Sequence, residues 1–305
     1  MTSKSLVIGS RGSDLAMWQA RFIQKVLTEE HGHAVEIKII KTAGDKIQHL
    51  SFDKMEGKGF FTKEIEEALL AKEIDLAVHS LKDLMTTQPE GLKLGAVGYR
   101  ADHRELLLIR NESFTDDGRV LPVKEDGIMG TSSARRKCQI VHHLPKAQIK
   151  DLRGNVPTRI NKLRDGQYDA IILALAGVSR LELDLSDLTT VALDPQEFYP
   201  APAQGILGIQ IREDDPDVEA VVGKLGDPRM MTTAIVERGL LKRFGSGCSL
   251  PLGVHSQTID GTIRLEAVLG IDENGKWVDL RRVDVSGPID DPERIVDEAY
   301  ELLKD

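Results

Sequence analysis

The start of the chain alternates between short apolar runs and one long amphipathic run. Residues 5–10 (SLVIGS) and 35–40 (VEIKII) are short and rich in β-branched residues, which predicts two strands. Between them, residues 11–32 carry apolar side chains at helical spacing, with Ser13 as the expected N-cap and Gly32 as the stop. A strand, a helix and a strand in this order predict a parallel sheet whose ligands lie at the carboxyl ends of the strands.

The same alternation continues along most of the chain. A helix is predicted at 60–73, followed by strands at 74–80, 91–100 and within 101–110. Further strand–helix units are predicted at 128–144, 147–166 and from residue 168, where Arg180 falls at a helix start. The last part predicts a helix from about Asp227, strands near 262–270 and 277–285, a turn at 272–275 and a terminal helix.

These elements predict an α/β protein with two lobes around a cleft and a small α+β C-terminal domain. The polar residues 99–104 and the residues near 196–200, at the start of the Pro-rich segment 197–211, are interpreted as two crossovers between the lobes. Domain 1 is therefore expected to comprise 1–99 plus 200–221, because the chain returns to it after domain 2. Domain 2 is expected at 100–199 and domain 3 at 222–305.

Charge adds a candidate site to this picture. The chain of 305 residues has a net charge of −9, yet residues 130–164 hold nine Lys or Arg against one acidic residue, Asp151. An acidic protein that concentrates positive charge in one segment is expected to bind an anion there. A solvated basic face is the alternative, but two successive strand–turn–helix junctions with arginines favour the anion site. The local patch and its lack of aromatic residues argue against nucleic acid.

Composition also narrows the class of protein. No apolar run reaches the length of a membrane span and no signal peptide is evident, so we expect a cytoplasmic protein with no membrane partner. Two cysteines, Cys138 and Cys248, are too few for a disulfide framework or a zinc site, and no metal is expected. Cys138 is interpreted as a packed helix residue. Cys248, between Gly247 and Ser249, is a candidate for covalent attachment.

Other candidate residues lie at strand ends and in one long loop. Lys82 and Asp83 follow the strand at 74–80 and could bind an anion and transfer a proton, although a surface ion pair or a loop cap is equally compatible. Arg11 and Ser13 follow the first strand. Residues 42–59, which include Lys54 and Lys58, are polar and without clear period, which indicates a functional loop.

Several long motifs in this order resemble the porphobilinogen deaminase family over essentially the full length. They are GSRGSDLAMWQA, GDK…GKGFFTKEIE, IDLAVHSLKDL, GTSSARRKCQ, LRGNVPTR, YDAIILALAG, PAPAQGILGI and GSGCSLPLG. The resemblance implies two lobes similar to type II periplasmic binding proteins and a third domain with a cysteine loop. It also implies a dipyrromethane cofactor attached to Cys248 through a thioether bond.

The implied reaction is hydroxymethylbilane synthesis, in which four porphobilinogen molecules are deaminated and added in turn to the cofactor. The linear product, hydroxymethylbilane, is then released into tetrapyrrole (haem) biosynthesis, and the cofactor stays on the enzyme. By resemblance, Asp83 is the catalytic residue that assists loss of ammonia and stabilises a pyrrole-nitrogen cation. The remaining implied positions bind carboxylates (Arg11, Ser13, Lys82, Arg135, Arg136, Arg153, Arg159, Arg180), support them (Gln19, Thr131, Ser133, Gln204) or form a flap (Lys54, Lys58).

Three residues depart from the family pattern. Asp14 and Met85 stand where the family commonly has proline, and Ser246 stands where the cysteine loop usually has glycine. None removes a group that the reaction needs. The resemblance further suggests a monomer with a small-molecule substrate. A non-catalytic receptor for carboxylates remains the alternative, because two lobes around an anion site would also suit one.

Overall fold

The computed structural model describes residues 5–42, 62–245 and 250–304. Over these residues the chain forms two compact units. Unit 1 contains residues 5–42, 62–101 and 205–231, and unit 2 contains residues 102–204 and the described residues from 232 onward. The chain thus leaves unit 1 after residue 101 and returns to it at residue 205. The predicted boundaries of three domains stay a prediction.

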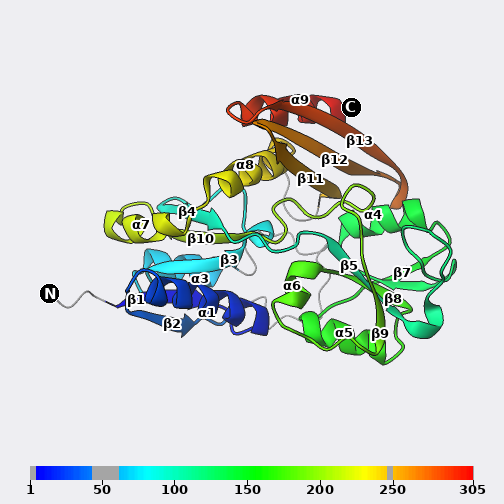
Figure 1. Ribbon diagram of the computed structural model, residues 1–305, viewed down its shortest axis with the longest axis horizontal. Coiled ribbons are helices and arrows are strands. Elements are labelled where there is room, and N and C mark those ends of the chain that lie inside the picture. The colour runs from blue at the N-terminus through cyan, green and yellow to red at the C-terminus, as the bar shows by residue number, and fades with distance from the viewer. Residues whose placement is uncertain (1–4, 43–61, 246–249, 305) are drawn as a thin grey trace. The chain divides into compact units, whose positions relative to one another are not determined.

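Unit 1 is built on a five-stranded sheet with the order β2-β1-β3-β10-β4. The strands β1, β2 and β3 run parallel, and β10 is antiparallel to both of its neighbours. The elements of this unit are β1 (Leu6–Ser10), α1 (Asp14–Glu29), β2 (Val35–Ile39), α3 (Lys63–Leu70), β3 (Leu76–Ser80), β4 (Leu92–Gly98), β10 (Leu207–Arg212) and α7 (Pro216–Val222) (Figure 1).

The first helix forms as its sequence predicts. Ser13 caps α1 by accepting a hydrogen bond from Ala16 N at 3.4 Å, and Gly32 beyond its end adopts a φ of 70°. The apolar stripe of α1 buries Ile23 and Leu27 completely in the core of unit 1, together with Ile8, Leu76 and other strand residues. Burial of this stripe fixes α1 against the sheet.

Unit 2 repeats the same sheet order with different strands, β7-β6-β8-β5-β9. Here β6, β7 and β8 are parallel, and β5 is antiparallel to β8 and β9. Its elements up to residue 204 are β5 (Glu105–Arg110), β6 (Ile128–Gly130), α4 (Ala134–His143), β7 (Gln148–Lys150), α5 (Val156–Arg164), β8 (Ala170–Ala174), α6 (Leu175–Ser179) and β9 (Leu188–Ala192) (Figure 1).

The C-terminal part of unit 2 is an antiparallel sheet with the order β11-β12-β13. Its elements are β11 (Leu252–Ile259), β12 (Thr262–Glu273), β13 (Lys276–Pro288), α9 (Pro292–Leu303) and α8 (Pro228–Arg243), of which residues 228–231 are assigned to unit 1. This sheet shares a core with α8 and α9, and α4 also packs on β12 and β13. A Cβ atom at Gly270 would lie 2.7 Å from Cys138 Sγ, so glycine lets β12 approach α4 closely.

The predicted fold class is confirmed, because two mixed α/β sheets and a small three-stranded α+β part are present. Two strands, β9 and β11, were missed in the sequence analysis, and one helix start was placed wrongly. The strand β11 was missed, because the buried His255 and Ser256 interrupt its apolar pattern. Arg180 does not begin a helix: it is the C-cap of α6, since the short helix starts directly at the end of β8.

Candidate functional site

Two parallel strand ends of unit 1 bring together the residues predicted near Asp83. Arg11 and Ser13 follow β1, and a 3₁₀ turn over Leu81–Asp83 follows β3, which pairs with β1. Gln19 on α1 donates from Nε2 to Ser80 Oγ at 2.7 Å and so joins the helix to the end of β3. At this edge Lys82 is half-buried, whereas the Asp83 carboxylate is exposed.

A buried histidine lies directly before this turn. The Nε2–H of neutral His79 donates to Gln210 Oε1 at 3.1 Å, and Gln210 Nε2 in turn donates to Gln88 Oε1 at 2.8 Å. Burial lowers the pKa of His79 to about 4; the bond to Gln210 opposes this shift and the charge of Arg11 adds to it. His79 is therefore neutral at pH 7 and links β3 to Gln210 of the adjacent strand β10. Asp83, in contrast, is exposed at this edge.

Two of the three residues that depart from the family pattern, Asp14 and Met85, lie among the described residues of unit 1. Asp14 is exposed in the first turn of α1, where its charge is stabilised by the positive end of the helix dipole. The Met85 carbonyl accepts a hydrogen bond from Gln88 Nε2 at 2.7 Å. Ser246 lies outside the described residues.

Unit 2 presents a second set of strand ends, and two helix N-termini meet there. Ser133 caps α4 by accepting from Arg136 N at 3.5 Å, and Asn155 caps α5 by accepting from Thr158 N at 2.9 Å. The Ser132 hydroxyl connects the two junctions through hydrogen bonds of 3.2 Å with Leu152 N and O. Helix N-termini with hydroxyls beside them are suited to bind anions.

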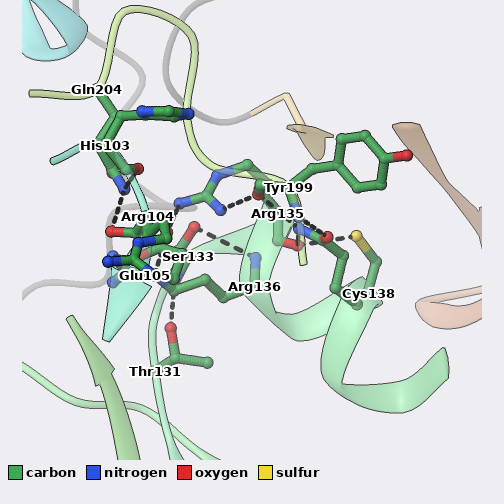
Figure 2. A network of polar contacts seen from close by, with 11 residues as sticks. His103, Arg104, Glu105, Thr131, Ser133, Arg135, Arg136, Cys138, Tyr199 and Gln204 are labelled. Atoms are coloured by element: carbon green, nitrogen blue, oxygen red, sulfur yellow. Dashed lines mark hydrogen bonds and ion pairs between the residues drawn. The ribbon is translucent and has the colours of Figure 1, made fainter. Parts of the chain in front are cut away.

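The predicted pair Arg135 and Arg136 is buried, and both guanidinium groups bind one internal carboxylate (Figure 2). Arg135 Nη2 lies 2.5 Å from Glu105 Oε1, and Arg136 donates from Nε and Nη2 to the two oxygens of Glu105 at 3.0 and 2.7 Å. Burial lowers the pKa of Arg135, an effect that Glu105 opposes and Arg136 reinforces. Sequence reasoning missed Glu105. The signal available was a charged residue opening the apolar run ELLLI.

The other predicted arginines lie at the same strand ends. Arg153 follows β7, and its carbonyl accepts from Lys162 Nζ at 3.0 Å, while Arg159 Nε donates to Gly154 O at 2.7 Å. Arg180 is buried at the end of α6, and burial lowers its pKa to about 10. Five predicted arginines thus gather around the carboxyl ends of β6, β7 and β8.

Two glutamines at this edge bind backbone. Gln204 Nε2 donates to His103 O at 2.9 Å and to Arg104 O at 3.4 Å. These hydrogen bonds connect the segment just after residue 101, where the chain leaves unit 1, to the segment just before residue 205, where it returns. Gln139, which sequence reasoning missed, accepts from Tyr199 N at 2.6 Å and donates from Nε2 to Tyr199 O at 3.0 Å. Thr131 supports the N-cap residue Ser133, since Thr131 Oγ1 accepts a hydrogen bond from Ser133 N at 3.2 Å.

The structure describes one of the two cysteines, Cys138, and confirms the prediction that it is a packed helix residue. Cys138 is 2% exposed, and its Sγ donates to Arg135 O at 3.1 Å. Burial raises the pKa of this thiol to about 11, so Cys138 is an unreactive thiol at neutral pH. Cys248, Lys54 and Lys58 lie outside the described residues.

The chemistry available at both edges is that of charge-assisted hydrogen bonding to anions. Arginines, hydroxyls and helix N-termini provide donors, and Asp83 provides one exposed carboxylate. Within residues 5–42, 62–245 and 250–304, no three His, Cys, Asp or Glu side chains cluster as a metal site would require. Over the same ranges, no helix has the length and apolar character needed to cross a membrane.

Comparison with known proteins gives consistent matches over nearly all of the chain. The family model for "Porphobilinogen deaminase, dipyromethane cofactor binding domain" matches residues 6–220, and that for "Porphobilinogen deaminase, C-terminal domain" matches residues 231–305. The porphobilinogen deaminase of Clostridium novyi is 36% identical over 301 residues, covering 98% of this chain and 97% of the relative. That of Sulfurimonas denitrificans is 43% identical over 270 residues, covering 88% and 84%.

Among solved structures, an ancestral cationic amino acid solute binding protein matches with a TM-score of 0.45 at 17% identity, covering 79% of this chain and 96% of that one. An ancestral arginine-binding protein matches with a TM-score of 0.42 at 12% identity, covering 81% and 100%. The two family models together span nearly all of the sequence, and the curated relatives align over most of their own length. The chain belongs to the porphobilinogen deaminase family.

Proposed function

We propose that this chain is a hydroxymethylbilane synthase, a transferase of tetrapyrrole biosynthesis. It removes ammonia from four porphobilinogen molecules in turn, joins them head to tail on a dipyrromethane cofactor and releases hydroxymethylbilane. The observation that carries the proposal is the match of the cofactor-binding family model to residues 6–220. Because the chain belongs to a family of enzymes, we prefer this function to the alternative of a non-catalytic carboxylate receptor.

The residues at the unit 2 strand ends suit such a cofactor. Each pyrrole ring carries an acetate and a propionate group, so a dipyrromethane presents four carboxylates. The donors at this edge are Arg136, Arg153, Arg159, Arg180 and the hydroxyls around the N-terminus of α4. The arginines suit carboxylates through charge-assisted, bidentate pairing, and the hydroxyls can add hydrogen bonds. When bound, the cofactor supplies the free pyrrole position to which each new ring is added.

The proposed catalytic residue is Asp83, with Lys82 and Arg11 holding substrate carboxylates. Asp83 is exposed on a tight turn at the end of β3, where a small substrate can reach its carboxylate. Its role is to assist transfer of a proton to the leaving amine as the carbon–nitrogen bond breaks, and to stabilise positive charge that develops on the pyrrole nitrogen. The neutral, buried His79 leaves this task to Asp83.

Attachment of the cofactor through a thioether to Cys248 is part of the proposal. A thioether forms from a reactive thiol, and the chain contains two cysteines. Cys138 is excluded as the attachment point by its burial and by its raised pKa. Cys248 is therefore the proposed site. The proposal also includes a cytoplasmic, monomeric enzyme that binds neither nucleic acid nor membrane, with Lys54 and Lys58 in a flap over the substrate.

The test is the intact mass of the freshly purified protein combined with turnover of porphobilinogen. We expect the wild type to carry the extra mass of one dipyrromethane and to convert porphobilinogen. Cys248→Ser should fold and show the bare polypeptide mass, and Cys138→Ser, the matched control, should keep the cofactor. Active wild type at the bare polypeptide mass would overturn covalent attachment. Wild type that carries the cofactor but converts no porphobilinogen would overturn the proposed reaction.

A further inference from the structure

A fully buried carboxylate lies between the two adjacent arginines of α4. Glu105 is 0% exposed, and three charged hydrogen bonds of 2.5, 3.0 and 2.7 Å connect it to Arg135 and Arg136 (Figure 2). Neither arginine is more than 8% exposed in its side chain. The pair that the sequence places in an anion site thus already holds an anion that belongs to the chain.

The sheet topology explains how Glu105 reaches this edge. Glu105 is the first residue of β5, which runs antiparallel to β8, and it pairs with Ala174, the last residue of β8. Because the two strands run in opposite directions, the amino end of β5 lies at the edge where β8 ends. Loop residues from the carboxyl ends of β6 and β7 and the start of α4 lie at the same edge. Glu105 is therefore part of the candidate anion site.

The two arginines make different sets of hydrogen bonds, which indicates different roles. Arg135 directs Nη2 to Glu105 and Nη1 to Tyr199 O at 2.7 Å, so both of its terminal nitrogens are bound within unit 2. Arg136 binds Glu105 with Nε and Nη2, a bidentate arrangement that fixes the plane of its guanidinium group. Within the described part of the chain, no residue accepts a hydrogen bond from Arg136 Nη1.

The charge of the cluster also indicates a ligand. Two guanidinium groups and one carboxylate sum to one surplus positive charge in a buried site. A surplus of positive charge among these buried groups suits a site that receives a further carboxylate. Glu105 lowers the charge of the pair from two to one and determines which edge of Arg136 stays available.

We propose that Glu105 is a positioning residue, which orients Arg136 so that its Nη1 edge binds one carboxylate of the pyrrole chain. Arg135 in this arrangement holds Tyr199 and Glu105 and does not contact the ligand. The inference rests on the proposed function, because the ligand is the cofactor of that reaction. From the sequence alone, both arginines are expected to bind ligand carboxylates, whereas in this proposal only Arg136 does so.

The experiment measures cofactor occupancy, which is the fraction of freshly purified protein at the cofactor-bearing intact mass. We expect Arg136→Lys, which keeps the charge but loses the bidentate geometry, to reduce occupancy about tenfold. Arg135→Lys, the matched control, should keep most of its cofactor. Glu105→Gln should reduce occupancy as Arg136→Lys does, and Glu105→Asp, which restores the carboxylate, should recover most of it.

A second control separates positioning from loss of stability. Asp75 is a buried carboxylate of unit 1 that accepts from Arg212 Nη2 at 3.3 Å and from Val7 N at 2.9 Å. Asp75→Asn should lower the melting temperature and keep normal occupancy. Full occupancy in Arg136→Lys, or equal losses in Arg135→Lys and Arg136→Lys, would overturn the inference even if Glu105→Gln fails to fold. Wild type without cofactor mass would overturn covalent attachment itself.

Discussion

Replacing Arg135 by methionine removes two hydrogen bonds from a site that excludes water. The lost bonds are those from Nη2 to Glu105 Oε1 at 2.5 Å and from Nη1 to Tyr199 O at 2.7 Å. Removal of one partner from a buried ion pair costs about 3–5 kcal/mol. Arg136 still binds both oxygens of Glu105, and Gln139 Nε2 still donates to Tyr199 O. We therefore expect the free energy of unfolding to fall by about 3 kcal/mol, the lower end of that range.

A matched control has the same substitution at an exposed ion pair. Arg264 donates two hydrogen bonds to Asp284 at 2.8 and 2.6 Å, and these two side chains are 42% and 53% exposed. Arg264 Nη2 also lies 3.2 Å from Glu266 Oε1, a contact that adds to the small loss expected for this control. Exposed pairs stabilise proteins by about 0–1 kcal/mol, because water screens the charges. Arg264→Met should therefore lower the free energy of unfolding by less than about 1 kcal/mol. The two variants differ in burial, while the chemistry of the change is the same.

The assay is urea unfolding followed by far-UV circular dichroism. Both substitutions are made in Cys248→Ser protein, so that cofactor binding does not contribute to the measured stability. With a slope of about 2 kcal/mol per molar urea, the midpoint should shift by about 1.5 M for Arg135→Met and by less than about 0.5 M for Arg264→Met. Equal small shifts would refute the reasoning, because they would show that the bonds to Glu105 stabilise the protein no more than an exposed pair.

Two further predictions concern unit 1. Asp83→Asn should keep the cofactor mass and lose most turnover of porphobilinogen, and near-normal turnover would place the proton transfer on another group. The pKa of His79 is lowered to about 4, below the value of 6.5 in the unfolded chain, so the unfolded state binds the proton first and stability is lost as the pH falls from 6.5 towards 4. Between pH 7 and pH 5 this contribution is about 2 kcal/mol in wild type and should be absent in His79→Gln. The same pH dependence of the urea midpoint in both proteins would contradict the assignment of that loss to His79.

The sequence by itself determined the local elements and the family. Apolar side chains at helical or alternating spacing identified most helices and strands, since both patterns reflect which face of an element is buried. Ser13 was identifiable as a helix cap because capping depends on residues three positions apart. The strand–helix junctions with Arg11, Asp83 and the arginines of residues 130–164 were also visible, because ligand sites follow the carboxyl ends of parallel strands.

Only the tertiary structure decided what the charged residues contact. Glu105 and Arg136 are 31 residues apart, and they meet because β5 runs antiparallel to β8, a pairing that no local pattern specifies. The same holds for His79 and Gln210, which are 131 residues apart on adjacent strands. A charge pattern along the chain predicts that a segment attracts anions. Whether a guanidinium group binds a ligand or an internal carboxylate depends on which strand ends are brought to the same edge of the sheet.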